Sequence, residues 1–207
     1  MRSRFPALLL FLAPLAPLFA QTPSDRLALD RFHDSLALTR DITSLRAAHR
    51  ALLRQRTGAP VVSLRAALVA LRLSELGADP GAGDARDELR RLTQREPGWP
   101  YAWHTLAAAE MRRAVWERAD PLALGNRVGT GTLERAIEHE RRAVAADPGY
   151  VPAALTLAQL TLGLRDTALY AGARDALRHA AAARAAPPVE LLLARGRLER
   201  AIGRAHV

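Results

Sequence analysis

The chain repeats one pattern of residues around its prolines. From Pro97 the sequence reads PGWPYAWHTLA, and from Pro148 it reads PGYVPAALTLA. In each copy the proline ends one predicted helix, and apolar residues at helical spacing begin the next. Helices that recur around such stops predict an array of paired helices, in which each pair packs on its neighbours.

The composition favours helices over strands. Apolar residues make up 49% of the 207 residues, aromatic residues make up only 5%, and most of the apolar content is Ala and Leu. Small Ala side chains let helices approach closely, and Leu fills the space between them. Val, Ile, Tyr and Thr are too sparse for a sheet. The predicted fold class is therefore all-α.

The second copy matches the pattern of a known family at six positions, Trp103, Leu106, Ala107, Ala136, Ala143 and Pro148. This order resembles the tetratricopeptide repeat, a helix-turn-helix unit of about 34 residues. The resemblance covers about residues 61–204, and it implies a right-handed α-solenoid of antiparallel helix hairpins. Glu110 and Glu140 depart from the pattern, because an aromatic and a large apolar residue are usual at their positions.

This frame divides the chain into three parts: a signal peptide (1–20), an N-terminal helical segment (21–58) and the helical repeats (59–207). The N-terminal segment is expected to break into two helices at 39–41, with Asp41 capping the second. The repeats are expected at about 61–97, 100–148 and 151–187, followed by a terminal helix at 189–204. That last helix either caps the array or leads into a longer protein.

The second repeat is longer than the family unit. Pro97 and Pro148 are 51 residues apart, against about 34 in the family. We expect the excess to form an inserted loop at 119–131, with the second helix beginning near Thr132. Insertions of this kind lie on one face of a solenoid.

The N-terminus has the layout of a secretory signal peptide. A short basic segment precedes an uncharged apolar run at 5–19, and Ala20 is the predicted cleavage site. An uncleaved membrane anchor is the alternative. The predicted location is the periplasm or the extracellular space. The chain has no Cys, which excludes disulfides, Cys nucleophiles, thiolate metal sites and lipoprotein acylation.

The formal net charge is +9, and all 30 basic residues are Arg. Loss of residues 1–20 removes two Arg and leaves a charge of +7. The remaining Arg are spread along the predicted helices, mostly beside Asp or Glu. Solvated helix faces therefore account for them better than a nucleic-acid interface.

The sequence contains no recognisable catalytic, cofactor or metal site. The six His lack metal-binding spacing, and the adjacent side chains of Glu138-His139-Glu140 diverge on a helix. The Gly-rich stretch at 125–131 lacks the Lys and the preceding strand of a phosphate loop. No Ser lies in a G-x-S-x-G turn. We therefore predict a protein that is not an enzyme.

In the tetratricopeptide family the first helix of each repeat lines a concave groove that binds other proteins. The frame above gives seven candidate groove residues: Arg65, Arg72, Tyr101, His104, Arg112, Gln159 and Arg197. This basic and aromatic lining would suit an acidic or extended peptide, because Arg forks bind carboxylates. The Asn residues of the family's carboxylate clamp are absent, so that activity is not carried over.

The predicted function is a non-enzymatic protein–protein interaction scaffold or adaptor in the bacterial periplasm or cell envelope. Two alternatives remain open. The chain is the N-terminal helical module of a larger envelope protein, or its basic surface binds an anionic polymer or lipid.

Overall fold

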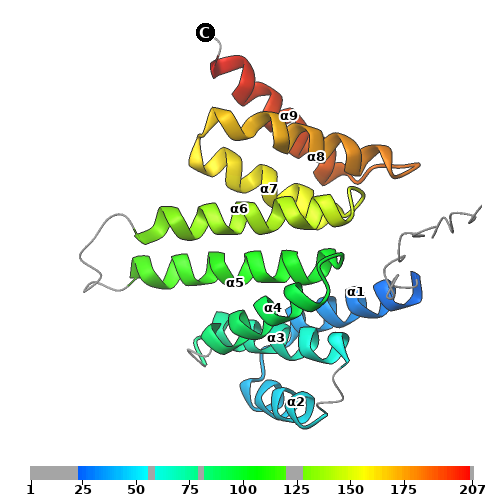
Figure 1. Ribbon diagram of the computed structural model, residues 1–207, viewed down its shortest axis with the longest axis vertical. Helices are drawn as coiled ribbons and strands as arrows, with labels where there is room; N and C mark the ends of the chain where they lie inside the picture. Colours follow the sequence, from blue (N-terminus) through cyan, green and yellow to red (C-terminus); the bar gives the residue numbers. More distant parts are fainter. Residues whose placement is uncertain (1–22, 56–58, 79–81, 120–127, 206–207) are drawn as a thin grey trace, which may run out of the picture.

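The computed structural model describes residues 23–55, 59–78, 82–119 and 128–205, and the predicted signal peptide lies outside these ranges. All regular elements within them are helical, which confirms the all-α prediction (Figure 1). There are nine α-helices and one 3-10 turn in this described part: α1 (Pro23–Leu38), α2 (Ile42–Arg54), α3 (Pro60–Glu75), α4 (Ala82–Arg95), α5 (Pro100–Ala119), α6 (Val128–Ala146), α7 (Val151–Leu164), η1 (Thr167–Leu169), α8 (Tyr170–Ala182) and α9 (Val189–Ala205).

The helices pack as successive hairpins, α3 with α4, α5 with α6, and α7 with α8, and α9 packs on the last hairpin. The first helices of the hairpins also touch one another along the array, α3 with α5, α5 with α7, and α7 with α9. Figure 1 shows the resulting stack of layers from α2 to α9. We call the side lined by α3, α5, α7 and α9 the inner face.

Local signals in the sequence set the helix boundaries. Pro60, Pro100 and Pro152 lie in the first turns of α3, α5 and α7, where a missing N–H costs nothing. Asp41 caps α2, because its carboxylate accepts hydrogen bonds from the backbone N–H groups of Thr43 and Ser44. The predicted break at 39–41 is therefore confirmed.

The core runs through the array as two large clusters of Leu and Ala. One joins α3, α4 and α5 around Leu64, Leu89 and Leu106, and the other joins α7, α8 and α9 around Leu177 and Leu198. All five Leu side chains are at most 1% exposed. Each hairpin thus buries its apolar side against a neighbour, as a solenoid requires.

The expected inserted loop at 119–131 is shorter in the structure. Helix α5 continues to Ala119 and α6 already begins at Val128, not near Thr132. Helices α5 and α6 are longer than those of the neighbouring hairpins, and they pack on each other along this extra length. Thr132 is buried in this hairpin. Residues 120–127 of the predicted loop lie outside the described residues.

Candidate functional site

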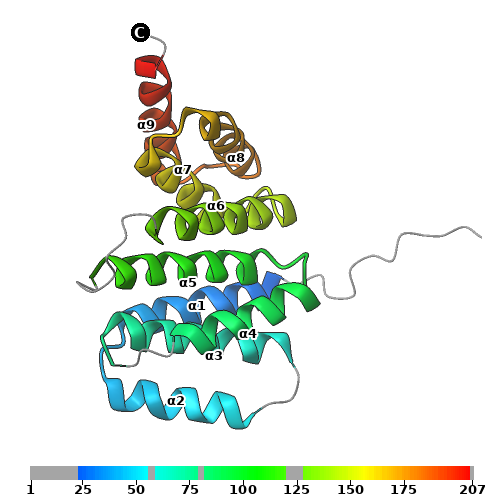
Figure 2. The ribbon, with the colours of Figure 1, turned by 60° about the vertical axis from the view of Figure 1, so that its left-hand side comes forward.

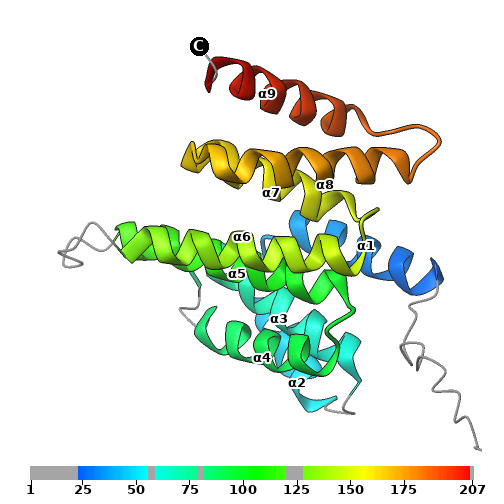
Figure 3. The ribbon, with the colours of Figure 1, turned by 45° about the horizontal axis from the view of Figure 1, so that its top comes forward.

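Helix α1 lies across the N-terminal half of the inner face. Its Leu29 is 1% exposed and belongs to the same core cluster as Leu64 and Tyr150. Polar contacts flank this apolar anchor: Arg26 pairs with Asp147 at 2.8 Å, and Asp30 accepts a hydrogen bond from the Tyr101 hydroxyl. Figure 2 shows α1 between α5 and α3, and in Figure 3 the same helix lies at the right, beside α5 and α6. The inner face therefore holds a helix of the chain itself.

Two predicted groove residues of α3 bind this N-terminal segment. The Arg65 guanidinium lies 5.2 Å from the centroid of the Phe32 ring of α1. Arg72 donates hydrogen bonds to the carbonyls of Ala37 (2.8 Å) and Thr39 (3.1 Å), where α1 ends. A cation is favourable at that point, because the last carbonyls of a helix lack partners within it.

The three predicted groove residues of α5 also have partners within the chain. Tyr101 packs on Tyr150 with ring centroids 4.8 Å apart, and burial, together with Asp30, raises the pKa of its hydroxyl. His104 Nδ1 lies 2.9 and 3.1 Å from the two carboxylate oxygens of Glu140. Arg112 donates to the Ser74 carbonyl at 3.0 Å, which ties α5 to the end of α3.

Two fully buried acids, Glu110 and Glu140, lie at the two positions that depart from the repeat pattern. Arg90 donates to Glu110 at 2.9 Å, and Arg135 approaches its second oxygen at 3.4 Å. Burial raises the pKa of Glu140, and the nearby His104 partly offsets that rise. The sequence showed that these acids were unusual but not that they had partners. Glu110 pairs with Arg90 of the preceding hairpin and with Arg135 of its own, and Glu140 pairs with His104 of its own hairpin.

A stack of aromatic and cationic side chains covers the second repeat. Trp103 lies in the core, and its indole N–H donates to the Pro97 carbonyl at 2.8 Å. The His139 ring stacks on Trp103 with centroids 5.7 Å apart, and the Arg142 guanidinium lies 4.9 Å from the same indole. Burial lowers the pKa of His139. This stack joins α5 to α6 and is structural.

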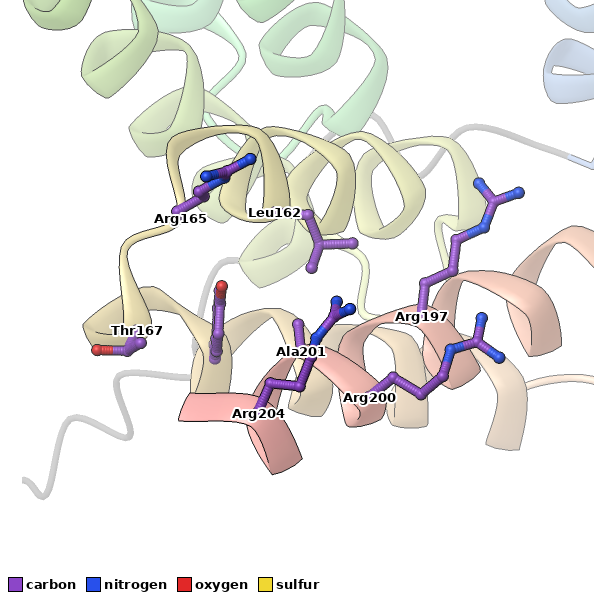
Figure 4. Close-up of a pocket in the computed structure, with 8 residues that line it drawn as sticks. Leu162, Arg165, Thr167, Arg197, Arg200, Ala201 and Arg204 are labelled. Atoms are coloured by element: carbon purple, nitrogen blue, oxygen red, sulfur yellow. The ribbon is translucent and has the colours of Figure 1, made fainter. Parts of the chain in front are cut away.

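The C-terminal half of the inner face stays open. Gln159 on α7 and Arg197 on α9, the last two predicted groove residues, are exposed. Arg197 borders a pocket of about 810 Å³ between α7, η1 and α9 (Figure 4), whose other lining residues are Leu162, Arg165, Thr167, Tyr170, Arg200, Ala201 and Arg204. The sequence reasoning found Arg197 but missed the other three arginines. The spacing of Arg197, Arg200 and Arg204, which places all three on one helix face, was the available signal.

The described residues contain no group of three His, Cys, Asp or Glu side chains that could hold a metal ion. None of the described helices is long and apolar enough to cross a membrane.

No protein-family model matches the chain, and no curated protein matches it in sequence. Among solved structures, the fold is similar to a thermophilic tetratricopeptide repeat protein of Thermus thermophilus, with a TM-score of 0.54 and 22% sequence identity. The match covers 87% of this chain and 79% of that protein. At this identity the likeness concerns the fold alone. The chain therefore has a tetratricopeptide-like architecture of stacked helix hairpins.

Proposed function

We propose that this protein is a non-enzymatic scaffold that binds a segment of another protein along its inner face. The observation that carries the proposal is the seating of α1. The inner face binds that helix through a buried apolar side chain, Leu29, with polar contacts from Arg26 and Asp30 on either side. A rigid array that binds one helix in this way loses little conformational freedom when it binds another segment. Tetratricopeptide-like folds are also typical of interaction scaffolds.

The partner segment is placed on the open half of the inner face, over α7 and α9. Of the seven predicted contact residues, Gln159 and Arg197 remain available there. The other five (Arg65, Arg72, Tyr101, His104 and Arg112) contact α1 or neighbouring helices in this structure. Arg65, Arg72 and Tyr101 would contact a partner only after α1 had left the face. His104 and Arg112 would first have to leave Glu140 and Ser74.

A photo-crosslinking residue at Gln159 tests this placement. The matched control carries the same residue at Arg178, an exposed position on the second helix α8. We expect a discrete protein adduct from position 159 and none from position 178. The captured protein is then purified and titrated against wild type, Gln159→Glu/Arg197→Glu and the control Arg174→Glu/Arg178→Glu.

The Gln159→Glu/Arg197→Glu variant should weaken binding at least about tenfold, since the loss of one charged contact, that of Arg197, costs about 1.5–3 kcal/mol. The control pair should leave binding within about twofold. Equal weakening by both pairs would mean that general charge attracts the partner, and it would overturn the proposed site.

We further propose export to the periplasm or the extracellular space. The supporting observation is the basic, apolar and cleavable layout of residues 1–20. The intact mass of the protein purified from its native cells tests this proposal. A mass that begins at Gln21 agrees with export, and a retained Met1 or Arg2 in a soluble protein contradicts it. A much larger mass would favour the alternative of a helical module within a longer envelope protein.

A further inference from the structure

The pocket between α7, η1 and α9 concentrates positive charge without an acidic partner. Its lining contains four arginines, Arg165, Arg197, Arg200 and Arg204, and no Asp or Glu. All four are exposed. No ion pair or hydrogen bond joins their side chains to any other side chain in the described part of the protein. Figure 4 shows Arg204 extending from α9 towards Leu162 of α7, with Arg197 extending from α9 further to the right.

The charge of the whole C-terminal region points to the same four residues. Residues 151–205 contain eight Arg and four acids, which leaves +4. The four arginines of this region that lie outside the pocket equal its four acids in number. The excess positive charge of +4 therefore equals the number of pocket arginines. Residues 21–150 carry only +3, from 20 Arg and 17 acids. More than half of the charge of residues 21–207 therefore lies in this region.

The backbone at Arg165 is a second, independent feature of the pocket. Arg165 ends α7 with a φ of 55°, and it is the one residue other than glycine with a positive φ in the described ranges. Glycine is the usual residue at such a helix end, because a side chain there is strained. The chain instead carries a long cation at this position, on the rim of the pocket.

We propose that this pocket binds a compact ligand that carries two phosphate groups. Each phosphate ester brings a charge of about −1.5 to −2 and three acceptor oxygens. Two such groups neutralise four guanidinium groups, and the planar Arg fork donates to phosphate in a bidentate manner. Carboxylates would have to number four for the same charge. Thr167 and Tyr170 are the residues with hydroxyl groups in the pocket lining.

This site goes beyond the scaffold function, and it shares Arg197 with the proposed partner surface. A soluble phosphate ester and a phosphorylated lipid headgroup share the chemistry that the pocket recognises. The test therefore uses two probes, inorganic pyrophosphate in solution and vesicles of a neutral lipid with added phosphatidate.

Calorimetric titration of the full chain with pyrophosphate at 0.15 M NaCl should show one saturable site. Arg197→Gln/Arg204→Gln should lower the affinity for pyrophosphate at least about 100-fold, because each of the two lost charged contacts contributes about tenfold. The matched control Arg174→Gln/Arg195→Gln removes the same charge from the same region and should change the affinity less than threefold. Citrate should bind at least tenfold more weakly than pyrophosphate.

The vesicle probe separates the two sources of the ligand. Vesicle binding that pyrophosphate displaces assigns the site to a lipid headgroup, and pyrophosphate binding without vesicle binding assigns it to a soluble phosphate ester. Absence of saturable pyrophosphate binding, equal loss in the control variant, or equally tight citrate binding would each overturn the proposal.

Thermal melting shows whether the variant is folded and adds an independent readout. Without ligand, Arg197→Gln/Arg204→Gln should melt at the same temperature as wild type or higher, because it relieves repulsion between like charges. Pyrophosphate should raise the melting temperature of wild type and not that of the variant. A variant that melts well below wild type would make these arginines structural and would contradict a ligand site.

Discussion

Removal of the His104 imidazole should leave the buried Glu140 carboxyl without its hydrogen-bond partner. In the folded protein His104 Nδ1 lies 2.9 Å from one oxygen of Glu140, whose side chain is fully buried. Breaking a buried pair by removing one partner costs about 3–5 kcal/mol. Domains of this kind have an unfolding free energy of about 5–15 kcal/mol. His104→Ala should therefore remove a large part of the stability at pH 7.5.

The cost should depend on pH, and its sign follows from Glu140. Burial raises the pKa of this carboxyl above its ordinary value. Its protonated form therefore favours folding below the ordinary pKa, and this contribution is lost as the pH rises through the raised value. His104 lowers the pKa of Glu140. Its removal should therefore raise that pKa further, and the loss of stability with rising pH should extend to a higher pH. His104→Ala should be less harmful at pH 5 than at pH 7.5.

Urea unfolding followed by far-ultraviolet circular dichroism at the two pH values measures this difference. His179→Ala, at an exposed position on α8, is the matched control and should stay within about 0.5 kcal/mol of wild type. His104→Ala/Glu140→Leu should recover most of the stability, because it replaces the buried polar pair with two apolar residues. A cost below about 1 kcal/mol for His104→Ala at pH 7.5, or a cost that is independent of pH, would refute the reasoning.

Three further predictions concern single contacts. Arg90→Ala/Arg135→Ala removes both cationic partners of the buried Glu110, and it should lower the free energy of unfolding, measured in urea, by about 3–5 kcal/mol. A decrease below about 1 kcal/mol would mean that water takes the place of the two arginines. Arg165→Gly should raise the free energy of unfolding by up to about 1 kcal/mol, because it relieves the left-handed backbone strain; a loss of stability would contradict that strain. Asp41→Ala should speed amide hydrogen exchange at the start of α2. In wild type the first turn of α2 should open in the same way at acid pH, because hydrogen bonds hold the pKa of Asp41 below its ordinary value and protonation removes them. Unchanged exchange in the variant would rule out the cap.

The sequence predicted those parts of the fold that depend on neighbouring residues. Pro100 marks a helix start and Asp41 caps α2, since each acts on its own turn of backbone. The repeat frame followed from these stops and from the spacing of the apolar residues. The start of α6 was not predicted, because Val128–Gly131 carries no strong helix signal. The packing of α6 against α5 decides the structure of this segment.

The contacts between distant segments could not be predicted in the same way. Nothing in the sequence of α1 indicates that Leu29 enters the core beside Tyr150, or that Tyr101 and Arg72 already have partners there. The frame correctly placed these two side chains on first helices. It could not show that a helix of the same chain lies over them, because such contacts depend on the whole arrangement. The pairing of Glu140 with His104 is hidden for the same reason.

The most direct test of the proposed interaction surface is a thiol-labelling experiment, for which the absence of native Cys is an advantage. Single cysteines at Gln159→Cys on α7 and Arg178→Cys on α8 are labelled with a maleimide, with and without the purified protein captured at position 159. The bound partner should slow labelling at position 159 at least tenfold and leave position 178 unchanged. Protection of position 178 with free labelling at position 159 would contradict binding at the inner face.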